Sequence, residues 1–241
     1  MNLQNIRIIL VQTYHPGNIG SAARAMKTMG LSDLRLIAPR QYPDEEATSL
    51  AAGATDILES ARVHETLEEA IADCTLVIGT SARSRQHSRP MLNGETCAQT
   101  AIEETSKDQK VAIIFGRERM GLSNEDLALC HYHAEISANP DYPILNLASA
   151  VQIISYELWK EANQTSSAVH DDKEYPTKEQ LANFETHLEL VLKDIGFLNQ
   201  KHPGEAMTRM ERFFNRTRME SKELRMWRGI LSSIERSIKE P

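Results

Sequence analysis

Short apolar runs that alternate with helix-like segments constrain the fold of this chain more than any other feature. Three of these runs are compact, rich in β-branched residues and bounded by polar or small residues, as buried strands are: Ile6 to Val11 (IRIILV), Thr75 to Gly79 (TLVIG) and Val111 to Phe115 (VAIIF). We expect two further strands, Leu34 to Ile37 and His133 to Ile136. Strands that alternate with helices at this spacing predict an α/β domain with a mostly parallel sheet flanked by helices.

Helix signals separate the expected strands. Asn18 to Met29 has helical character and stops at Gly30, a residue type that commonly ends a helix. Ser123 is followed three residues later by Asp126, which resembles a capping box at the start of a helix. We expect further helices from Glu65 to Ala72 and from Leu145 to Trp159.

The chain changes character after its first 160 residues. Residues 162–178 are polar, contain Pro176 and show no hydrophobic period, which is typical of a linker. Residues 179–241 then look wholly helical. We therefore expect a domain at 1–161, a linker at 162–178 and a small helical C-terminal region at 179–241 for RNA binding or dimerisation.

The charge distribution permits a nucleic-acid partner although the net charge is -7. Residues 161–200 hold three Lys against eight acidic residues, whereas residues 201–239 hold ten Lys or Arg against five Glu. A polyanion meets local patches rather than the average charge of a chain.

Several classes of protein are not expected. No apolar run approaches the roughly 20 residues of a membrane span, and the N-terminus lacks the pattern of a signal peptide. The three cysteines are widely spaced without a CxxC pair, and His131 and His133 have no third ligand nearby in sequence, so we expect neither disulfides nor a metal site. These features predict a cytoplasmic protein.

The first candidate site segment is His15-Pro-Gly-Asn-Ile-Gly-Ser-Ala-Ala-Arg24, which follows a strand and opens a helix. Ligands of open α/β sheets bind at the carboxyl ends of the strands, where this segment lies. Its small residues allow another backbone or a ligand to approach closely, but a tight turn carrying a surface Arg explains it equally well. It matches neither GxGxxG nor a P-loop, so a classical dinucleotide fold is unsupported.

Two further segments follow buried strands. Gly79 to Arg85 (GTSARSR) places hydroxylated residues before Arg83 and Arg85, as a loop facing a cofactor and a phosphate backbone would. Phe115 to Ser123 (FGRERMGLS) places Glu118 between two Arg, where it could orient an Arg or a ribose. Solvated surface loops are the alternative for both segments.

Asn139 to Ser149 (NPDYPILNLAS) leads from a strand into the long helix, with Asn146 at the helix start, where it is either a simple cap or part of a binding site. In the C-terminal region, two basic sets recur at helical spacing: Arg209, Arg212 and Arg216, and Arg218, Lys222 and Arg225. They are either an RNA-binding stripe or the solvated face of a dimerising bundle, with Met210, Phe213 and Phe214 packed inward.

The four segments occur in the order and spacing of a known family. The pieces HPGNIGSAARAMKTMGL, GTSARSR, FGRERMGLSNEDL and NPDYPILNLASAVQ resemble the SPOUT-class RNA 2′-O-methyltransferases, and among them the bacterial enzymes that act on cytidine or uridine at position 32 of the tRNA anticodon loop. The resemblance is strong over residues 1 to about 160 and looser in the helical tail.

The resemblance implies a C-terminal trefoil knot in the α/β domain, S-adenosyl-L-methionine as cofactor, and a homodimer that completes the active site. It implies Arg24 as the catalytic residue, supported by Asn18 and Glu118. The residues that would line the cofactor site are Thr80, Ser81, Ala82, Gly116, Ile136, Ile144, Leu145 and Asn146. Close relatives often have Ser where this chain has Ile144, so only backbone contacts carry over at that position.

The expected function is therefore methylation of a ribose 2′-hydroxyl of cytidine or uridine at position 32 of tRNA. Arg83, Arg85, Arg209, Arg212 and Arg216 would contact the RNA. The rival interpretations are an RNA-binding module with a vestigial cofactor pocket and a nucleotide-dependent oxidoreductase.

Overall fold

The computed structural model describes residues 3–81, 91–164, 174–198 and 204–239. The chain divides into two compact units, Met1–Ala168 and Val169–Pro241. Each unit is described by itself.

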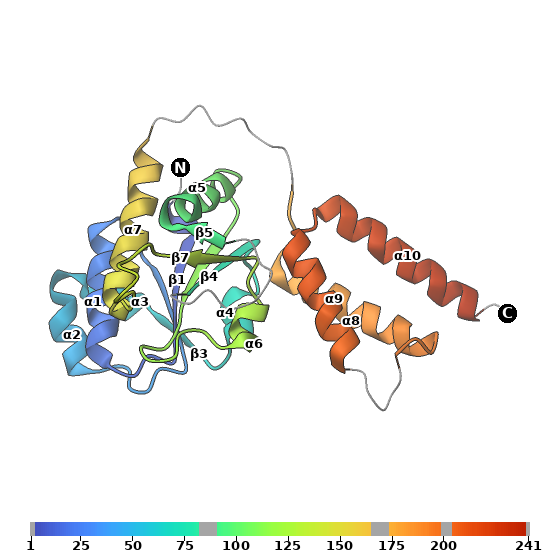
Figure 1. Ribbon diagram of the computed structural model, residues 1–241, viewed down its shortest axis with the longest axis horizontal. Helices are drawn as coiled ribbons and strands as arrows, with labels where there is room; N and C mark the ends of the chain where they lie inside the picture. The colour runs from blue at the N-terminus through green and yellow to red at the C-terminus, as the bar shows by residue number, and fades with distance from the viewer. Residues whose placement is uncertain (1–2, 82–90, 165–173, 199–203, 240–241) are drawn as a thin grey trace. The chain divides into compact units, whose positions relative to one another are not determined.

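The first unit is built on one parallel sheet of seven strands (Figure 1). The strands are β1 (Ile6–Val11), β2 (Asp33–Ile37), β3 (Arg62–His64), β4 (Leu76–Thr80), β5 (Met91–Asn93), β6 (Val111–Phe115) and β7 (Tyr132–Glu135), in the order β3-β2-β1-β6-β4-β7-β5. All six residues of β1 are buried, because helices cover both faces of the sheet. The predicted α/β class is confirmed, but the sequence analysis missed the short edge strands β3 and β5.

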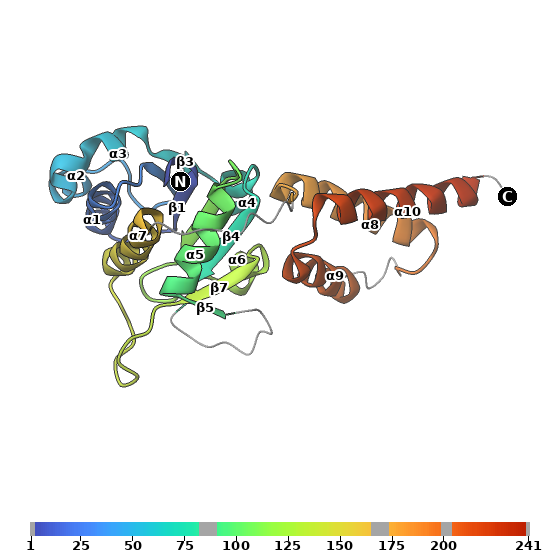
Figure 2. The same cartoon turned by 90° about the horizontal axis from the view of Figure 1, so that it is seen from above.

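The helices of this unit are α1 (Pro16–Thr28), α2 (Glu45–Ala51), α3 (Thr55–Ser60), α4 (Leu67–Ile71), α5 (Gly94–Thr105), α6 (Asn124–Ala128) and α7 (Leu147–Asn163), with short 3₁₀ turns at Leu3–Asn5 and Ala52–Ala54. Alternate residues of β1 supply two separate cores. Ile6, Ile8 and Leu10 pack with α1, α5 and α7, whereas Ile9 and Val11 pack with α4 and α6 (Figure 2).

The helix that follows β1 is shaped by its small residues. Pro16 is the first residue of α1, and Gly30, at φ +73°, follows its end as predicted. A Cβ atom on Gly20 would lie 2.0 Å from the carbonyl oxygen of Ala47 in α2. The small residues of this segment therefore let two helices pack closely. Of the two partners expected for these residues, another backbone or a ligand, the structure shows the backbone at Gly20.

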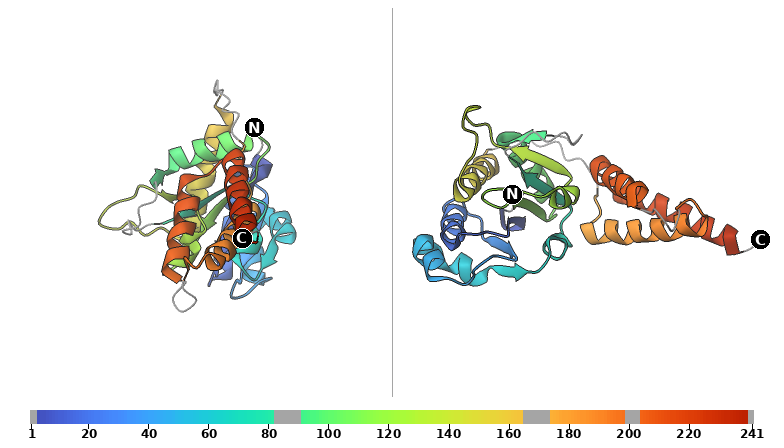
Figure 3. Two further views of the ribbon diagram at one scale, coloured as in Figure 1. Left: turned by 90° about the vertical axis from the view of Figure 1, so that its right-hand side faces the viewer. Right: turned by 60° about the horizontal axis from the view of Figure 1, so that its bottom comes forward.

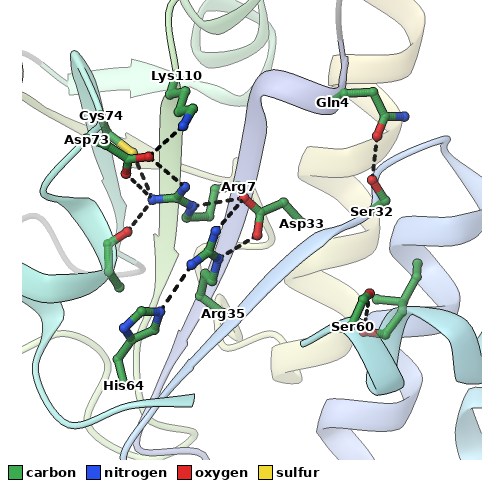
Figure 4. Close-up of polar contacts among 12 residues, drawn as sticks. Gln4, Arg7, Ser32, Asp33, Arg35, Ser60, His64, Asp73, Cys74 and Lys110 are labelled. Carbon is green, nitrogen blue, oxygen red and sulfur yellow. Dashed lines mark hydrogen bonds and ion pairs between the residues drawn. The ribbon is translucent and has the colours of Figure 1, made fainter. Parts of the chain in front are cut away.

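Charged side chains at the amino ends of the strands form a half-buried network (Figure 4). The Arg7 guanidinium donates to Asp33 over 3.0 Å and to Asp73 over 2.7 Å, and Arg35 donates to Asp33 over 2.6 Å. Burial opposes ionisation of the two carboxyl groups, but these hydrogen bonds outweigh it and lower the pKa of both Asp33 and Asp73. The network balances buried Arg residues at the edge of the sheet opposite to the strand carboxyl ends, so it serves the fold.

The second unit consists of α8 (Lys178–Asp194), α9 (Gly204–Thr217) and α10 (Ser221–Lys239), which Figure 3 shows together. Phe184, Phe214 and Leu231 are among the residues of its core. The helical character predicted for this region is confirmed. The inward packing predicted for Phe213 is wrong, because this side chain is 47% exposed.

The second predicted basic stripe is also wrong. Arg218 lies between α9 and α10 with φ +48°, so it does not continue a helical face with Lys222 and Arg225. Its guanidinium instead stacks over the ring of Tyr175 at 4.1 Å.

Two expectations about the chain path stay predictions: the trefoil knot and the domain limits at 161 and 179. Among the described helices, none is long and apolar enough to span a membrane.

Candidate functional site

A cavity of about 230 Å³ opens at the carboxyl ends of β4, β6 and β7. It is lined by six of the residues predicted to hold the cofactor, namely Thr80, Ser81, Gly116, Ile136, Ile144 and Leu145. The sequence analysis did not single out Pro143, Leu147 and Ala150, which also line it. Ala82, Arg83 and Arg85 lie outside the described residues.

The end of β4 forms one wall of this cavity and is fixed by its neighbouring strands. The Thr80 hydroxyl donates to the Ile114 carbonyl over 2.9 Å, and the Ser81 amide donates to the Ala134 carbonyl over 2.9 Å. The polar atoms at this wall are thus held in place by β6 and by the end of β7.

A tight turn from Gly116 to Gly121 also lines the cavity. A Cβ atom on Gly116 would lie 2.1 Å from the backbone of Gly121, so no other residue fits without moving the turn. Arg117 and Gly121 exchange backbone hydrogen bonds, and the Arg117 side chain donates to Gln12 over 2.7 Å and to Asp126 over 3.1 Å. Arg117 therefore anchors the turn, which leaves Glu118 and Arg119 near its tip.

Glu118 joins this turn to the segment after β1. Its carboxylate accepts hydrogen bonds of 3.1 Å from the Tyr14 and His15 amides and of 3.0 Å from the Asn18 side chain. Burial raises the pKa of this carboxyl group, but the donated hydrogen bonds outweigh burial, so the net pKa of Glu118 is lowered. Glu118 is consequently an anionic acceptor, which holds the two segments together.

Asn18 also contacts Asn146. The Asn146 side-chain amide donates to the Asn18 side-chain carbonyl over 2.9 Å, while its own carbonyl accepts from the Ala148 amide over 2.9 Å. Asn146 is therefore the predicted cap of α7 and a member of the site at once, although it does not itself line the cavity. We call Glu118, Asn18 and Asn146 the polar relay.

Arg24 lies apart from this cavity. It is on α1, about two turns beyond Asn18, its side chain is exposed, and it is not among the cavity-lining residues. Within the described residues its guanidinium has no hydrogen bond or ion pair. The structure of one chain thus joins Asn18 and Glu118 but does not bring Arg24 to them.

The predicted RNA-contacting residues of the second unit are all on α9. Arg209, Arg212 and Arg216 are exposed, and Arg209 pairs with Glu205 over 3.3 Å. The first predicted stripe is therefore available to solvent.

The composition of the cavity fits a nucleoside cofactor better than a metal. Ile136, Ile144 and Leu145 supply apolar walls, and Thr80, Ser81 and the backbone of Gly116 add polar groups to the lining. No cluster of three or more His, Cys, Asp or Glu that could hold a metal is present in the described part of the chain. His131 is buried and accepts a hydrogen bond from the Val77 amide over 2.9 Å, which is a structural role.

Comparisons with known proteins point to one family. The SpoU rRNA Methylase family matches residues 5–156, and the family "tRNA methyltransferase TrmJ, C-terminal domain" matches residues 179–241. The tRNA (cytidine/uridine-2'-O-)-methyltransferase TrmJ of Salmonella typhimurium is 49% identical and that of Escherichia coli K12 is 50% identical, each over 98% of this chain. The alignments cover 99% of the Salmonella protein and 98% of the Escherichia protein.

Two solved structures are similar over nearly the whole chain. TrmJ from Z. mobilis ZM4 superposes with a TM-score of 0.82 at 36% identity, covering 95% of this chain and 98% of that one. A methylase family protein from Haemophilus influenzae Rd KW20 superposes with a TM-score of 0.65 at 45% identity, covering 99% of both chains. The resemblance noted from the four sequence segments is confirmed, and the chain belongs to the SpoU methylase family.

Proposed function

We propose that this protein methylates the ribose 2′-hydroxyl of cytidine or uridine in tRNA, at position 32 of the anticodon loop, with S-adenosyl-L-methionine as methyl donor. The observation that carries the proposal is the polar relay beside the cavity, which joins three of the four segments typical of the family. The activity of the relatives that match 98% of the chain, the tRNA (cytidine/uridine-2'-O-)-methyltransferases, supports the substrate class.

The cavity would hold the cofactor. Ile136, Ile144 and Leu145 would pack against its apolar parts, and backbone groups near Ser81 and Gly116 would bind its polar parts. When bound, its sulfonium supplies an electrophilic methyl group. Because position 144 is Ile, only its backbone and apolar surface are available for this task.

Arg24 would position the substrate rather than act as a base. A guanidinium is essentially always protonated, since its pKa lies above about 12. It can instead bind the phosphate next to the target ribose and stabilise negative charge that develops on the 2′-oxygen. Asn18 and Glu118 would hold the segment after β1 in the geometry that this requires.

A homodimer would complete the site. Arg24 is exposed and lies outside the cavity of its own chain, which suits an Arg that serves the cavity of a second copy. Tyr156 and Trp159 of α7 are 47% and 44% exposed, and α7 packs beside α1. Large aromatic side chains at solvent positions of one helix are typical of a protein interface.

The second unit would bind the tRNA backbone through Arg209, Arg212 and Arg216. Their exposure on one helix supports this, as does the excess of basic residues in positions 201–239. We place the methyltransferase domain at 1–161 and the helical region at 179–241, joined by a linker. The three cysteines are buried and none is in a disulfide, in keeping with a cytoplasmic location.

A transfer assay tests the proposal. The full chain is incubated with unmodified bulk tRNA and S-adenosyl-L-methionine that carries a labelled methyl group. Incorporation into tRNA that is lost in Arg24→Ala is expected. Cofactor binding without incorporation into any RNA would favour the RNA-binding module with a vestigial pocket.

A further inference from the structure

The loops after β1 and β2 place an arginine against an aromatic ring beside the polar relay. The Arg40 guanidinium carbon lies 3.9 Å from the ring centroid of Tyr14, and the Tyr14 and His15 rings meet edge to face with centroids 4.9 Å apart. All three side chains are exposed. An Arg that lies over an aromatic face at this distance makes a favourable cation–π contact.

The stack leaves the hydrogen-bonding edge of Arg40 available. Stacking uses the flat face of a guanidinium, whereas its five N–H donors point outward in the plane. Within the described residues no carboxylate pairs with Arg40, and its side chain has no hydrogen bond. The nearby Asp44 has other partners. Its two carboxylate oxygens accept hydrogen bonds from the Glu46 amide over 2.8 Å and from the Gln41 side chain over 2.6 Å.

The backbone on both sides of the stack is fixed. The Tyr14 and His15 amides donate to Glu118, and the Arg40 amide donates to the Thr13 carbonyl over 3.0 Å. The guanidinium is thus held by one ring on an anchored backbone, and the Arg40 side chain is exposed. A preorganised fork of this kind matches the geometry of a phosphate.

We propose that Arg40, held by Tyr14, clamps a phosphate of the substrate RNA next to the nucleotide that enters the site, and that the exposed His15 ring contacts an unpaired base there. Single-stranded RNA loops are recognised by such combinations of aromatic rings and Arg planes. The inference rests on the proposed function for its choice of RNA as the ligand.

The test is the salt dependence of tRNA binding by the full chain, measured by filter binding at several KCl concentrations. Arg40→Ala removes one phosphate contact, so the slope of log affinity against log salt should fall by about 0.7–0.9. Tyr14→Ala keeps the charge but frees the Arg, so affinity should drop about 2–5-fold with the slope nearly unchanged. Tyr14→Phe keeps the ring and should bind as the unsubstituted protein does.

Arg62→Ala is the matched control, because Arg62 is an exposed Arg at the amino end of β3, whereas Arg40 follows the carboxyl end of β2. The salt slope and the tRNA affinity of Arg62→Ala should equal those of the unsubstituted protein. Equal slopes for Arg40→Ala and Arg62→Ala would overturn the clamp, whether or not the protein methylates tRNA. If the salt slope falls only in Arg40→Ala and the unsubstituted protein transfers no methyl group, Arg40 binds an RNA phosphate but the proposed reaction is wrong.

Discussion

The Asn146 side chain donates a hydrogen bond of 2.9 Å to the Asn18 side chain across 128 residues of sequence. This contact joins the start of α7 to the start of α1. Asn18 in turn donates a hydrogen bond to Glu118, which lies after β6. Side chains therefore tie the turn after β6 to the segments that begin α1 and α7.

Replacing Asn18 by Ala should lower kcat about 10–100-fold, because a small displacement of substrate-positioning groups is costly to catalysis. Glu118 would lose one donor and Asn146 its acceptor. Steady-state kinetics on tRNA measure the effect. Asn5→Ala is the control, since Asn5 makes an exposed hydrogen bond to Asp108 away from the cavity. Equal rates for the two variants would show that the relay does not contribute to catalysis.

Replacing Gly116 by Ala should abolish cofactor binding. The added methyl would meet the Gly121 and Leu122 backbone at 2.1 and 2.2 Å, so the turn that forms one wall of the cavity must move. Calorimetric titration with S-adenosyl-L-methionine measures the loss. Gly53→Ala is the control, because nothing lies within 4 Å of a Cβ atom there. Normal affinity in Gly116→Ala would show that the cofactor does not use this turn.

Mixing two inactive variants tests whether two chains share one site. The Arg24→Ala variant has an intact cavity but lacks the Arg24 side chain. The Gly116→Ala variant has Arg24 but an altered cavity. If Arg24 serves the partner's cavity, random exchange into dimers should restore about one quarter of the sites. Methyl transfer by the co-refolded mixture measures this, and Leu145→Asp provides a second cavity variant. No recovery with either cavity variant would contradict the shared site.

The sequence predicted the fold where the pattern was long or strong. β1 and β6 match their expected limits, and the capping box of Ser123 and Asp126 is present at α6. The edge strands β3 and β5 are three residues each, too short for an apolar period, and most of their residues are exposed. Such strands are defined by their neighbours in the sheet, which a local pattern does not contain.

The sequence predicted which residues belong to the site better than it predicted the contacts between them. Six of the cavity-lining residues were expected from the family motifs. That Asn146 contacts Asn18, and that Glu118 binds the amides of Tyr14 and His15, depends on the chain bringing distant loops to one sheet edge. The stack of Arg40 on Tyr14 was missed for the same reason, because neither residue belongs to a motif.

Replacing Glu185 by Gln should stabilise the second unit at high pH. Burial, followed by the nearby Glu211, raises the pKa of Glu185 to about 7, while Lys178 opposes the shift, and one buried oxygen of Glu185 has no partner among the described residues. Because the folded state holds this proton more tightly than the unfolded state, wild-type stability falls as pH rises from about 4.5 to about 7. The variant avoids this loss. Its free energy of unfolding should exceed that of the unsubstituted protein by on the order of 1–2 kcal/mol at pH 8, and should differ little at pH 4.5.

Hydrogen exchange of α8 and α9 in the full chain, compared between variants at each pH, measures this gain. Glu179→Gln is the control, since Glu179 is exposed on the same helix and its replacement should have the same effect at both pH values. A gain for Glu185→Gln that does not change with pH would contradict the assignment.

The position and chemistry of the transferred methyl group decide whether this protein is a 2′-O-methyltransferase of tRNA. Unmodified tRNA is treated with the full chain and S-adenosyl-L-methionine, digested with nuclease, and analysed by mass spectrometry. We expect one 2′-O-methylated cytidine or uridine at position 32, with the rate lowered about 10²–10³-fold in Arg24→Ala. A methyl group on a base, a methyl group at another position, or an undiminished rate in Arg24→Ala would contradict it.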